Sequence, residues 1–386
     1  MKQDQSSGAT PNATAGMRRN AGLPWWAVMA AAALLVSACT GGASASPSAA
    51  GASPGGASPS AASPSGDASP SGDASPSASG PAIAYPEAPI TFVVPFTAGG
   101  PTDTVTRLIA EPMKTALGQE IVVQNVTGAG GTLAAGQVAQ EEPDGYTVLM
   151  HHIGMSTAPA LYPDLPYDPL TSFKPIGLVT EVPMTFIGRS GYAPTTFEEL
   201  VADVKANGEN VRYGHAGPGA ASHLCGLLFQ DAVEAKVTEV PYEGTADVIE
   251  DLLGDRDIDF SCDQTTNTTT QIKAGSVKAY AITSPERNEA LPDIPTTAEA
   301  GVPDIAVGVW HGLYVPAETP DEIVAALTEA LQGALEDQNV ITKFAELGTA
   351  PVAADQATPA AHTAKLQEQL QLWGPIIEAA GGGTAP

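Results

Sequence analysis

Three glycine-rich turns contain the residue types best suited to binding an anion. They lie at residues 96–103 (FTAGGPTD), 127–132 (TGAGGT) and 214–219 (GHAGPG). Glycine permits a positive φ and close approach of the backbone, so successive N–H groups can converge on one anion. Each turn precedes a stretch with helical spacing, whose first N–H groups lack partners within the helix and carry the positive end of its dipole. The turns therefore favour a carboxylate held by backbone amides.

The residues around these turns disfavour nucleotides. None of the turns ends in the Gly-Lys-Ser/Thr of a P-loop. A dinucleotide fingerprint has its third glycine three residues after the second. Here those positions hold Leu133, after Gly130, and Ser222, after Gly219. The alternative, that the glycines only allow tight turns, is reasonable for one turn but weaker for three that share the same strand and helix context.

Other chemistries find no support in the sequence. His151 and His152 are adjacent, so on a strand they point to opposite faces and cannot form a two-ligand metal face. No zinc-type spacing and no Gly-x-Ser-x-Gly elbow occurs. The 16 basic against 43 acidic residues give a net charge of −27, which argues against nucleic acid. We expect no cofactor, no metal and no enzymatic activity.

The elements that must position the turns alternate between strand-like and helix-like runs, which predicts α/β lobes with largely parallel sheets. The expected strands are 90–96, 121–125, 146–151, 211–214, 237–240, 258–262 and 277–282. The expected helices are 103–117, 133–140, 220–229 and 247–253, with a helical stretch over 321–380.

The N-terminal region reads as an export signal. Arg18 and Arg19 precede an apolar run over 23–38, which is short for a membrane span and ends in small residues before Cys39. This pattern resembles the bacterial lipobox, whose cysteine is lipidated after cleavage; an ordinary signal peptide with a chance cysteine is the alternative. We expect translation to start at Met17.

Residues 40–80 consist only of Gly, Ala, Ser, Pro and Thr, apart from Asp67 and Asp73. Such a segment cannot bury a core, so we expect residues 39–84 to be a lipidated cysteine followed by a disordered tether. Cleavage after residue 38 would remove three basic residues and one acidic residue and leave a net charge of −29.

A series of motifs over residues 85–375 resembles the Bug/TctC family, the extracytoplasmic solute-binding proteins of tripartite tricarboxylate transporters. In chain order the motifs are 95–103 (PFTAGGPTD), 128–131 (GAGG), 143–147 (PDGYT), 165–168 (LPYD), 213–224, 240–242 (VPY), 253–254 (LG), 272–275 (IKAG), 291–296 (LPDIPT) and 298–301 (AEAG).

The resemblance implies a type II periplasmic-binding-protein-like α/β fold, with two α/β lobes, mixed sheets and a hinged interlobe cleft. Lobe one would comprise 85–186 with 308–386, and lobe two 187–307. The chain would then be a lipid-anchored, extracytoplasmic monomer that captures a small organic carboxylate for integral membrane transporter subunits. A receptor for a sensor system, or a hydrolase, is the alternative.

By the same resemblance, two turns grip one carboxylate of the solute and the other lobe sets specificity. The implied ligand-binding residues are Phe96, Thr97, Ala98, Gly99, Thr102, Asp103, Gly130, Gly131, Ser156, Gly217, Gly219, Ser222, His223, Tyr242 and Asp263.

Three residues near the expected site, Asp103, His223 and Glu243, leave alternatives open. Asp103 could orient a bridging water or cap its own helix. His223 could donate to the solute, although an isolated histidine is more often structural. Tyr242 offers a flat wall with one donor. Glu243 would repel a second ligand carboxylate if it faces the cleft and would change nothing if it faces solvent.

Two cysteines remain in the folded part. Cys225 lies on the helix after the third turn and Cys262 ends a strand of the same expected lobe. Outside the cytoplasm they should form a disulfide if their Cα atoms lie within about 7 Å; two buried free thiols are the alternative. Such a bond would be structural, since the chain has no Cys-x-x-Cys motif.

Overall fold

The computed structural model describes residues 84–379. The expected signal segment, Cys39 and the expected tether lie outside these residues. Among the helices that it describes, none combines the length and the apolar character that crossing a membrane requires.

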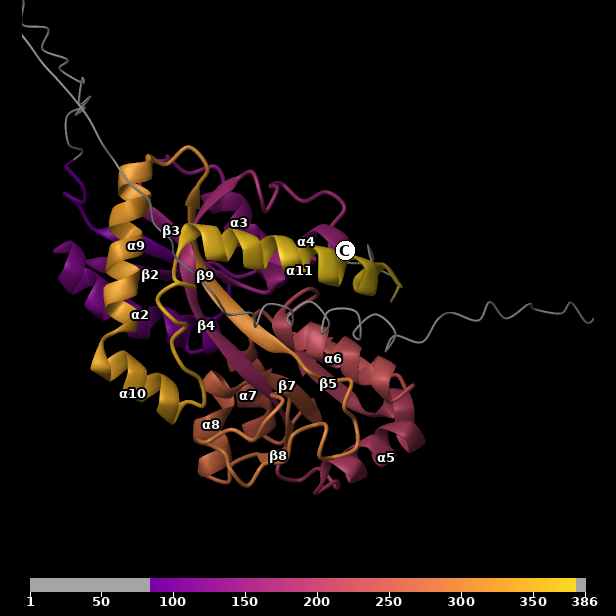
Figure 1. Cartoon of the computed structure of the whole chain (residues 1–386). Coiled ribbons are helices and arrows are strands. Elements are labelled where there is room, and N and C mark those ends of the chain that lie inside the picture. Colours follow the sequence, from indigo (N-terminus) through magenta and orange to yellow (C-terminus); the bar gives the residue numbers. More distant parts are fainter. Residues whose placement is uncertain (1–83, 380–386) are drawn as a thin grey trace, which may run out of the picture. The chain divides into compact units, whose positions relative to one another are not determined.

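The described chain alternates strands and helices (Figure 1). The strands are β1 (Ile90–Val94), β2 (Ile121–Asn125), β3 (Thr147–His152), β4 (Phe173–Gly188), β5 (Arg212–His215), β6 (Thr238–Pro241), β7 (Phe260–Gln264), β8 (Lys278–Ile282) and β9 (Gly308–Pro316). The α-helices are α2 (Pro101–Leu117), α3 (Thr132–Val138), α4 (Gly154–Leu161), α5 (Phe197–Asn207), α6 (Ala221–Ala232), α7 (Thr245–Leu253), α8 (Thr265–Lys273), α9 (Asp321–Leu335), α10 (Gln338–Glu346) and α11 (Pro359–Ala379). The 3-10 turns are η1 (Ala129–Gly131) and η2 (Gly208–Asn210).

The strands follow the order β2-β1-β3-β9-β4-β7-β5-β6, and β8 also pairs with β4. The pairs β1–β2, β1–β3, β5–β6 and β5–β7 are parallel, as expected for strands joined by helices. The pairs that involve β4 or β9 are antiparallel, so the arrangement is mixed. We call β1, β2, β3 and their partner β9 the first half of the sheet, and β5 to β8 the second half.

The long strand β4 connects the two halves. It runs beside β9 as far as the pairing of Pro183 with Gly308 and then changes partner, so that Met184 pairs with Gln264 of β7 (Figure 1). The two halves are therefore joined by continuous extended backbone. The division into lobes at residues 186/187 and 307/308 stays a prediction.

Apolar clusters pack on both halves, and one of the clusters contains residues of both. In the first half, Phe92 of β1 packs in one buried cluster with Ile109 of α2 and Leu327 of α9. In the second half, Phe186 at the end of β4 packs against Phe229 of α6 at a ring-centroid distance of 5.2 Å. Burial of these faces holds the helices against the strands.

The bounds of helix α2 follow from the residues at its two ends. Pro101 occupies the first turn, where its missing N–H costs nothing, and Gly118 ends the helix in the left-handed conformation with φ 68°. The apolar positions Val105, Ile109 and Met113 are fully buried. The helix continues through Pro112.

The expected helical stretch over 321–380 is correct only in part. Within the described residues it consists of α9, α10 and α11, and residues 347–358 interrupt it between α10 and α11. Gly348 in this interruption has φ +75°, a conformation that favours glycine and ends a helix.

Candidate functional site

A cavity lies where four strands end. Phe96 follows β1, His152 ends β3, Ala216 follows β5, and Asp263 with Gln264 ends β7; all of them line the cavity. Two of these strands belong to each half of the sheet, and ligands of open α/β folds bind beyond the carboxyl ends of such strands. In this structure the enclosed space is small.

Four helices begin at the same cavity. The lining residues include the N-terminal residues Thr102 of α2, Ser222 of α6 and Thr245 of α7. The fourth helix, α8, begins just after Gln264, which also lines the cavity. Four helix dipoles thus present their positive ends to one small space.

The first N–H groups of these helices are free of intrahelical bonds. In α2 the first such bond runs from the N–H of Thr104 to the oxygen of Gly100 (2.9 Å), and in α6 from the N–H of Leu224 to the oxygen of Ala220 (3.1 Å). The N–H groups that precede them can therefore donate to a ligand. No lysine or arginine occurs among the cavity-lining residues of the described chain.

His152 adds a side-chain donor that the sequence did not indicate. Its Nδ1 accepts a hydrogen bond from the N–H of Gly154 at 2.9 Å. Burial, with the neighbouring His151 and His311, lowers the pKa of His152 well below its usual range, so the ring is neutral and carries its proton on Nε2. The ring stacks on Phe96 with centroids 4.7 Å apart. Its position at the end of a strand parallel to β1 was the available signal.

Asp103 organises the first turn. Its carboxylate accepts hydrogen bonds from the N–H of Gly99 (2.9 Å), from Arg107 Nε (2.8 Å) and from Asn125 Nδ2 (3.0 Å). Burial acts to raise the pKa of Asp103, but these hydrogen bonds outweigh it and lower that pKa. Asp103 therefore fixes the turn before α2, whose N-cap Gly100 receives no side-chain capping bond. The two roles considered for Asp103 stay predictions.

The glycine turns bring the two halves into direct contact. A Cβ at Gly244 would lie 2.1 Å from Thr97 Oγ1, and a Cβ at Gly130 would lie 2.0 Å from the carbonyl oxygen of Pro218. Glycine is thus required at both positions for close approach. In this structure the expected second grip, around Gly130, contacts protein across the boundary and does not line the cavity.

Hydrogen bonds also join segments of the two halves. The hydroxyl of Tyr162, just after α4, donates to the oxygen of Pro218 at 2.8 Å. Thr157 Oγ1 of α4 donates to the oxygen of Gly219 at 3.0 Å. The structure therefore represents a conformation in which the two halves are closed on each other.

The structure brings four of the expected ligand-binding residues together as cavity lining: Phe96, Thr102, Ser222 and Asp263. Of the others, Thr97, Gly130, Gly131, Gly217 and Gly219 lie in the contacting turns, Ala98 and Gly99 are exposed, and Ser156 Oγ donates to the oxygen of Ile153. Their roles toward a ligand stay predictions.

Two further expected residues have protein partners in this conformation. His223 Nδ1 accepts from the N–H of Gly219 at 3.1 Å, and its Nε2 lies 3.7 Å from Glu239, whose pKa it lowers to about 2. The hydroxyl of Tyr242 donates to Asp251. Glu243 is exposed. This corresponds to the alternative in which Glu243 faces solvent and does not repel a second carboxylate of the ligand.

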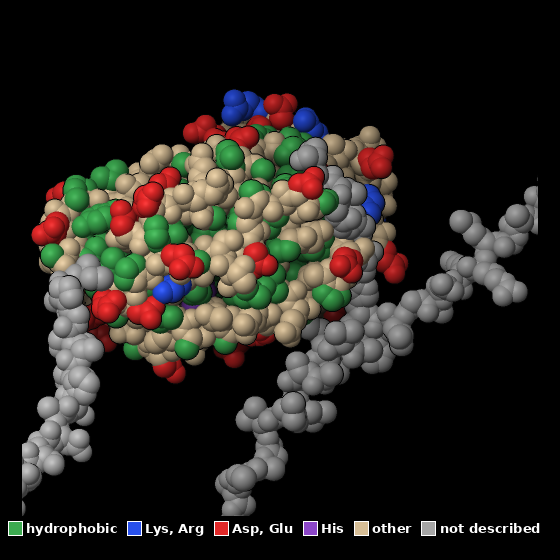
Figure 2. All heavy atoms as spheres, turned by 90° about the horizontal axis from the view of Figure 1, so that it is seen from above, with side chains coloured by type: hydrophobic (Ala, Val, Ile, Leu, Met, Phe, Trp, Pro, Cys, Tyr) green, Lys and Arg blue, Asp and Glu red, His purple; other side chains and the backbone are tan. Residues whose placement is uncertain are grey.

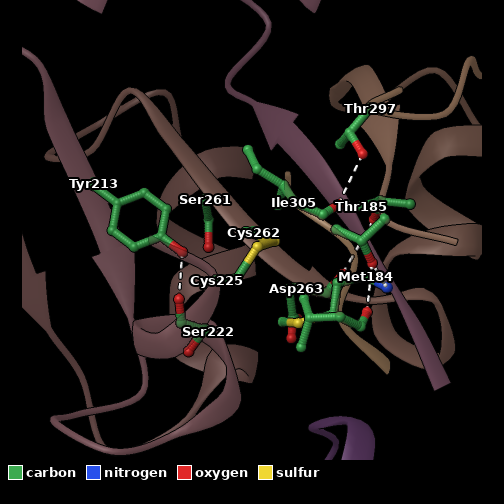
Figure 3. Close-up of a disulfide and its surroundings, with 12 residues drawn as sticks. Met184, Thr185, Tyr213, Ser222, Cys225, Ser261, Cys262, Asp263, Thr297 and Ile305 are labelled. Atoms are coloured by element: carbon green, nitrogen blue, oxygen red, sulfur yellow. Dashed lines mark hydrogen bonds between the residues drawn. A yellow bond between two sulfur atoms is a disulfide. The ribbon is translucent and has the colours of Figure 1, made fainter. Parts of the chain in front are cut away.

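A disulfide lies close to two of the cavity-lining residues, Ser222 and Asp263 (Figure 3). Cys225 of α6 is bonded to Cys262 of β7, with Cα atoms 6.1 Å apart. Cys262 immediately precedes Asp263, and Cys225 follows Ser222 by one helical turn. The bond therefore ties together the two elements of the second half that carry these lining residues.

The surface charge is mainly negative. Acidic side chains are scattered over the face in Figure 2 and basic ones are few. Within residues 84–379, no group of three His, Cys, Asp or Glu side chains is placed to hold a metal ion.

Three comparisons place the chain among known proteins. A sequence model of the tripartite tricarboxylate transporter family receptor, TctC, matches residues 105–382. A protein of Agrobacterium vitis, the UPF0065 protein in the TAR-I ttuE-ttuC' intergenic region, is 51% identical over 77% of this chain and 86% of its own length.

Solved structures agree with the sequence match. Periplasmic binding protein BugD has a TM-score of 0.76 and 46% identity, covering 78% of this chain and 99% of that one. MatC of Rhodopseudomonas palustris, solved with bound malate, has a TM-score of 0.73 and 39% identity, covering 76% of this chain and 99% of that one. The predicted periplasmic-binding-protein fold is thereby confirmed.

Proposed function

Because the chain belongs to the TctC family of tripartite tricarboxylate transporter receptors, we propose that it binds a small organic carboxylate in the cavity and delivers it to integral membrane subunits of such a transporter. The family is one of binding proteins, so a hydrolase is no longer a competing interpretation.

The convergence of four helix N-termini on one cavity carries this proposal. Free N–H groups and helix dipoles stabilise a negative charge without a cationic side chain. The cavity lining, which contains Thr102, His152 and Ser222 but neither lysine nor arginine, fits that mode of binding. Because MatC was solved with bound malate, the likeness to MatC supports a carboxylate of about the size of malate as the ligand of this chain.

Ser222 and His152 can add directed donors. Ser222 Oγ accepts from the N–H of Ala216 at 2.9 Å, which leaves its own proton for a ligand. His152 offers Nε2–H from the first half of the sheet. A carboxylate between them would be held from both halves and would stabilise the closed conformation.

The direct test is a binding screen with the exported chain. Small mono-, di- and aromatic carboxylates are expected to raise the melting temperature, because a ligand that binds only the native state stabilises it. Neutral and cationic compounds of the same size serve as the comparison. Stabilisation by neutral or cationic compounds alone would contradict the proposal.

A matched pair of variants locates the binding site. Ala221→Asp places a carboxylate at the first turn of α6, in the cavity lining, and should weaken binding of the acid found in the screen about 100-fold or more. Ala202→Asp adds the same charge at an exposed position of α5 and should leave the affinity unchanged. Equal affinities for both variants would place the site elsewhere.

The anchor is the second part of the proposal. The apolar run before Cys39 and the tether after it support an extracytoplasmic protein held at the membrane by a lipidated Cys39. Mass spectrometry of the N-terminal peptide should detect a diacylated cysteine, and Cys39→Ala should abolish that modification. An unmodified N-terminus at another residue would indicate an ordinary signal peptide.

A further inference from the structure

The end of β7 forms an acceptor-rich wall of the cavity. Asp263 and Gln264 are 1% and 2% exposed and both line the cavity. Gln264 Oε1 is buried without a hydrogen-bond partner in the described part of the chain. A buried acceptor without a partner costs free energy, so a donor on a bound molecule would satisfy it.

Asp263 places a carboxylate beside that acceptor. Its Oδ2 accepts a hydrogen bond from Asn267 Nδ2 of α8 at 2.5 Å. No lysine or arginine of the described residues is within ion-pair distance of it. Burial without a cation raises the pKa of Asp263 to about 6, so at neutral pH it is predominantly charged.

The surroundings of Asp263 offer no compensating charge from any element at the cavity. The groups that face it or share the cavity with it are Asn267 of α8, Thr245 of α7, Ser222 of α6, Thr102 of α2 and the neutral His152 of β3.

The cavity therefore has two kinds of wall. The helix N-termini and His152 present donors, which suit a carboxylate. Asp263 presents a carboxylate, which repels one, and Gln264 presents the unpartnered acceptor Oε1 on an amide that also carries two N–H donors. A solute with one carboxylate and nothing else to donate would leave the acceptors unsatisfied. A solute whose second functional group is a donor would satisfy both walls.

We propose that Asp263 is a specificity-determining residue that accepts a hydrogen bond from a hydroxyl or ammonium group on the bound carboxylate and discriminates against acids that lack such a donor. This inference rests on the proposed function and narrows its ligands to hydroxy and amino acids.

Calorimetry on the exported chain tests the preference with two matched sets of four-carbon acids. The first set is butyrate, 2-hydroxybutyrate and 2-aminobutyrate; the second is succinate, malate and aspartate. In at least one set the hydroxy or amino member should bind about tenfold or more tightly than the unsubstituted member, as for a hydrogen bond to a charged acceptor. Preference for the hydroxy or the amino member identifies the donor.

Variants assign the preference to Asp263. Asp263→Asn keeps the shape, removes the charge and should reduce the preference about tenfold or more. Asp259→Asn is the matched control, because Asp259 lies at the opposite end of β7 and pairs with Arg189 at 2.9 Å; it should retain the wild-type preference. If Asp263→Asn does not fold, the wild-type preference alone decides.

The outcomes separate the two proposals. An unsubstituted acid that binds as tightly as its hydroxy and amino counterparts would overturn the role of Asp263 and leave carboxylate binding intact. An Asp263→Asn variant with an undiminished preference would overturn it too. If no acid binds here or in the wider screen, both proposals fail.

Discussion

The hydroxyl of Tyr162 donates a hydrogen bond to the carbonyl oxygen of Pro218 at 2.8 Å. Tyr162 lies on the segment after β3 and Pro218 on the segment after β5, two strands of opposite halves of the sheet. Burial raises the pKa of Tyr162 to about 12, so it remains a donor at physiological pH. The bond can form only when the turn at residues 217–219 lies against α4. It is therefore a marker of the closed conformation, and closure is what retains a solute.

Tyr162→Phe should weaken binding of the preferred acid about fivefold, because one intramolecular hydrogen bond contributes about 1 kcal/mol. The change should lie in a faster dissociation rate, measured by stopped-flow fluorescence. Tyr85→Phe is the control: Tyr85 donates to the oxygen of Gly145 at 2.7 Å away from the cavity. Equal effects of the two variants would argue against a role in closure.

Gly244→Ala should impair closure without straining the backbone. Gly244 has an extended φ of −173°, which any residue adopts, but its Cβ would lie 2.1 Å from Thr97 Oγ1. We expect solute affinity to fall about tenfold or more and solute-induced compaction in small-angle scattering to diminish. Gly333→Ala, where a Cβ meets nothing within 4 Å, should preserve both. Unchanged compaction in Gly244→Ala would contradict the expectation.

Asp263→Asn should stabilise the protein in a pH-dependent way. The pKa of Asp263 is about 6 in the folded chain against an ordinary 3.8, so its favourable contribution is complete below about pH 3.8 and is lost as the pH rises through 6. The whole shift corresponds to about 3 kcal/mol. The variant should therefore exceed the wild type in free energy of unfolding at about pH 8 and approach it at about pH 4.

Urea unfolding at several pH values measures that difference. The buried histidines, such as His311 with a pKa lowered to about 3, titrate in both proteins and cancel from the comparison. A difference that stays constant with pH would show that Asp263 keeps an ordinary pKa in the folded state.

Loss of the Cys225–Cys262 bond should affect both stability and binding. The bond closes a loop of 37 residues, for which the chain-entropy relation gives about 4 kcal/mol. The Cys225→Ala/Cys262→Ala variant should melt at a lower temperature and bind the preferred acid more weakly, because Ser222 and Asp263 lose their common tether. Lower stability with unchanged affinity would limit the bond to a stabilising role.

Salt should not weaken capture of the acid. The mature chain carries a net charge of −29 if cleavage precedes Cys39, and this charge repels an anion at long range. Screening beyond about 8 Å removes the repulsion and spares the local dipoles. The association rate should therefore rise or stay constant as salt is added. A steep fall in stopped-flow measurements would indicate capture by a cationic patch.

The sequence was most informative where local patterns decide the structure. β2 spans Ile121–Asn125 as expected, and α2 extends two residues before its expected start because Pro101 is suited to the first turn. By contrast, β4 was not among the expected strands. It contains Pro175 and Pro183, which break strand patterns, and its partners lie far away in the sequence.

For the cavity, the glycine turns indicated the region, and the family resemblance supplied the four expected residues that line it, including Asp263, which adjoins no glycine turn. Phe96, Thr102 and Ser222 adjoin recognisable turns, whereas His152, Thr245 and Gln264 reach the cavity only because strands and helices distant in the sequence end at one place. The turn glycines had a second purpose that composition does not show. Gly130 and Gly244 allow backbone from opposite halves to touch.

The exchange of partners along β4 has a mechanical consequence. Pro183 pairs with Gly308, the next residue pairs with Gln264, and Gln264 also lines the cavity. If one half rotates about this point, atoms near the axis travel little and those at the periphery travel far. A small movement of a molecule bound beside the axis would therefore accompany a large displacement of the outer rim. If the membrane subunits of the proposed function contact only that rim, they would detect a bound solute without contacting the solute itself.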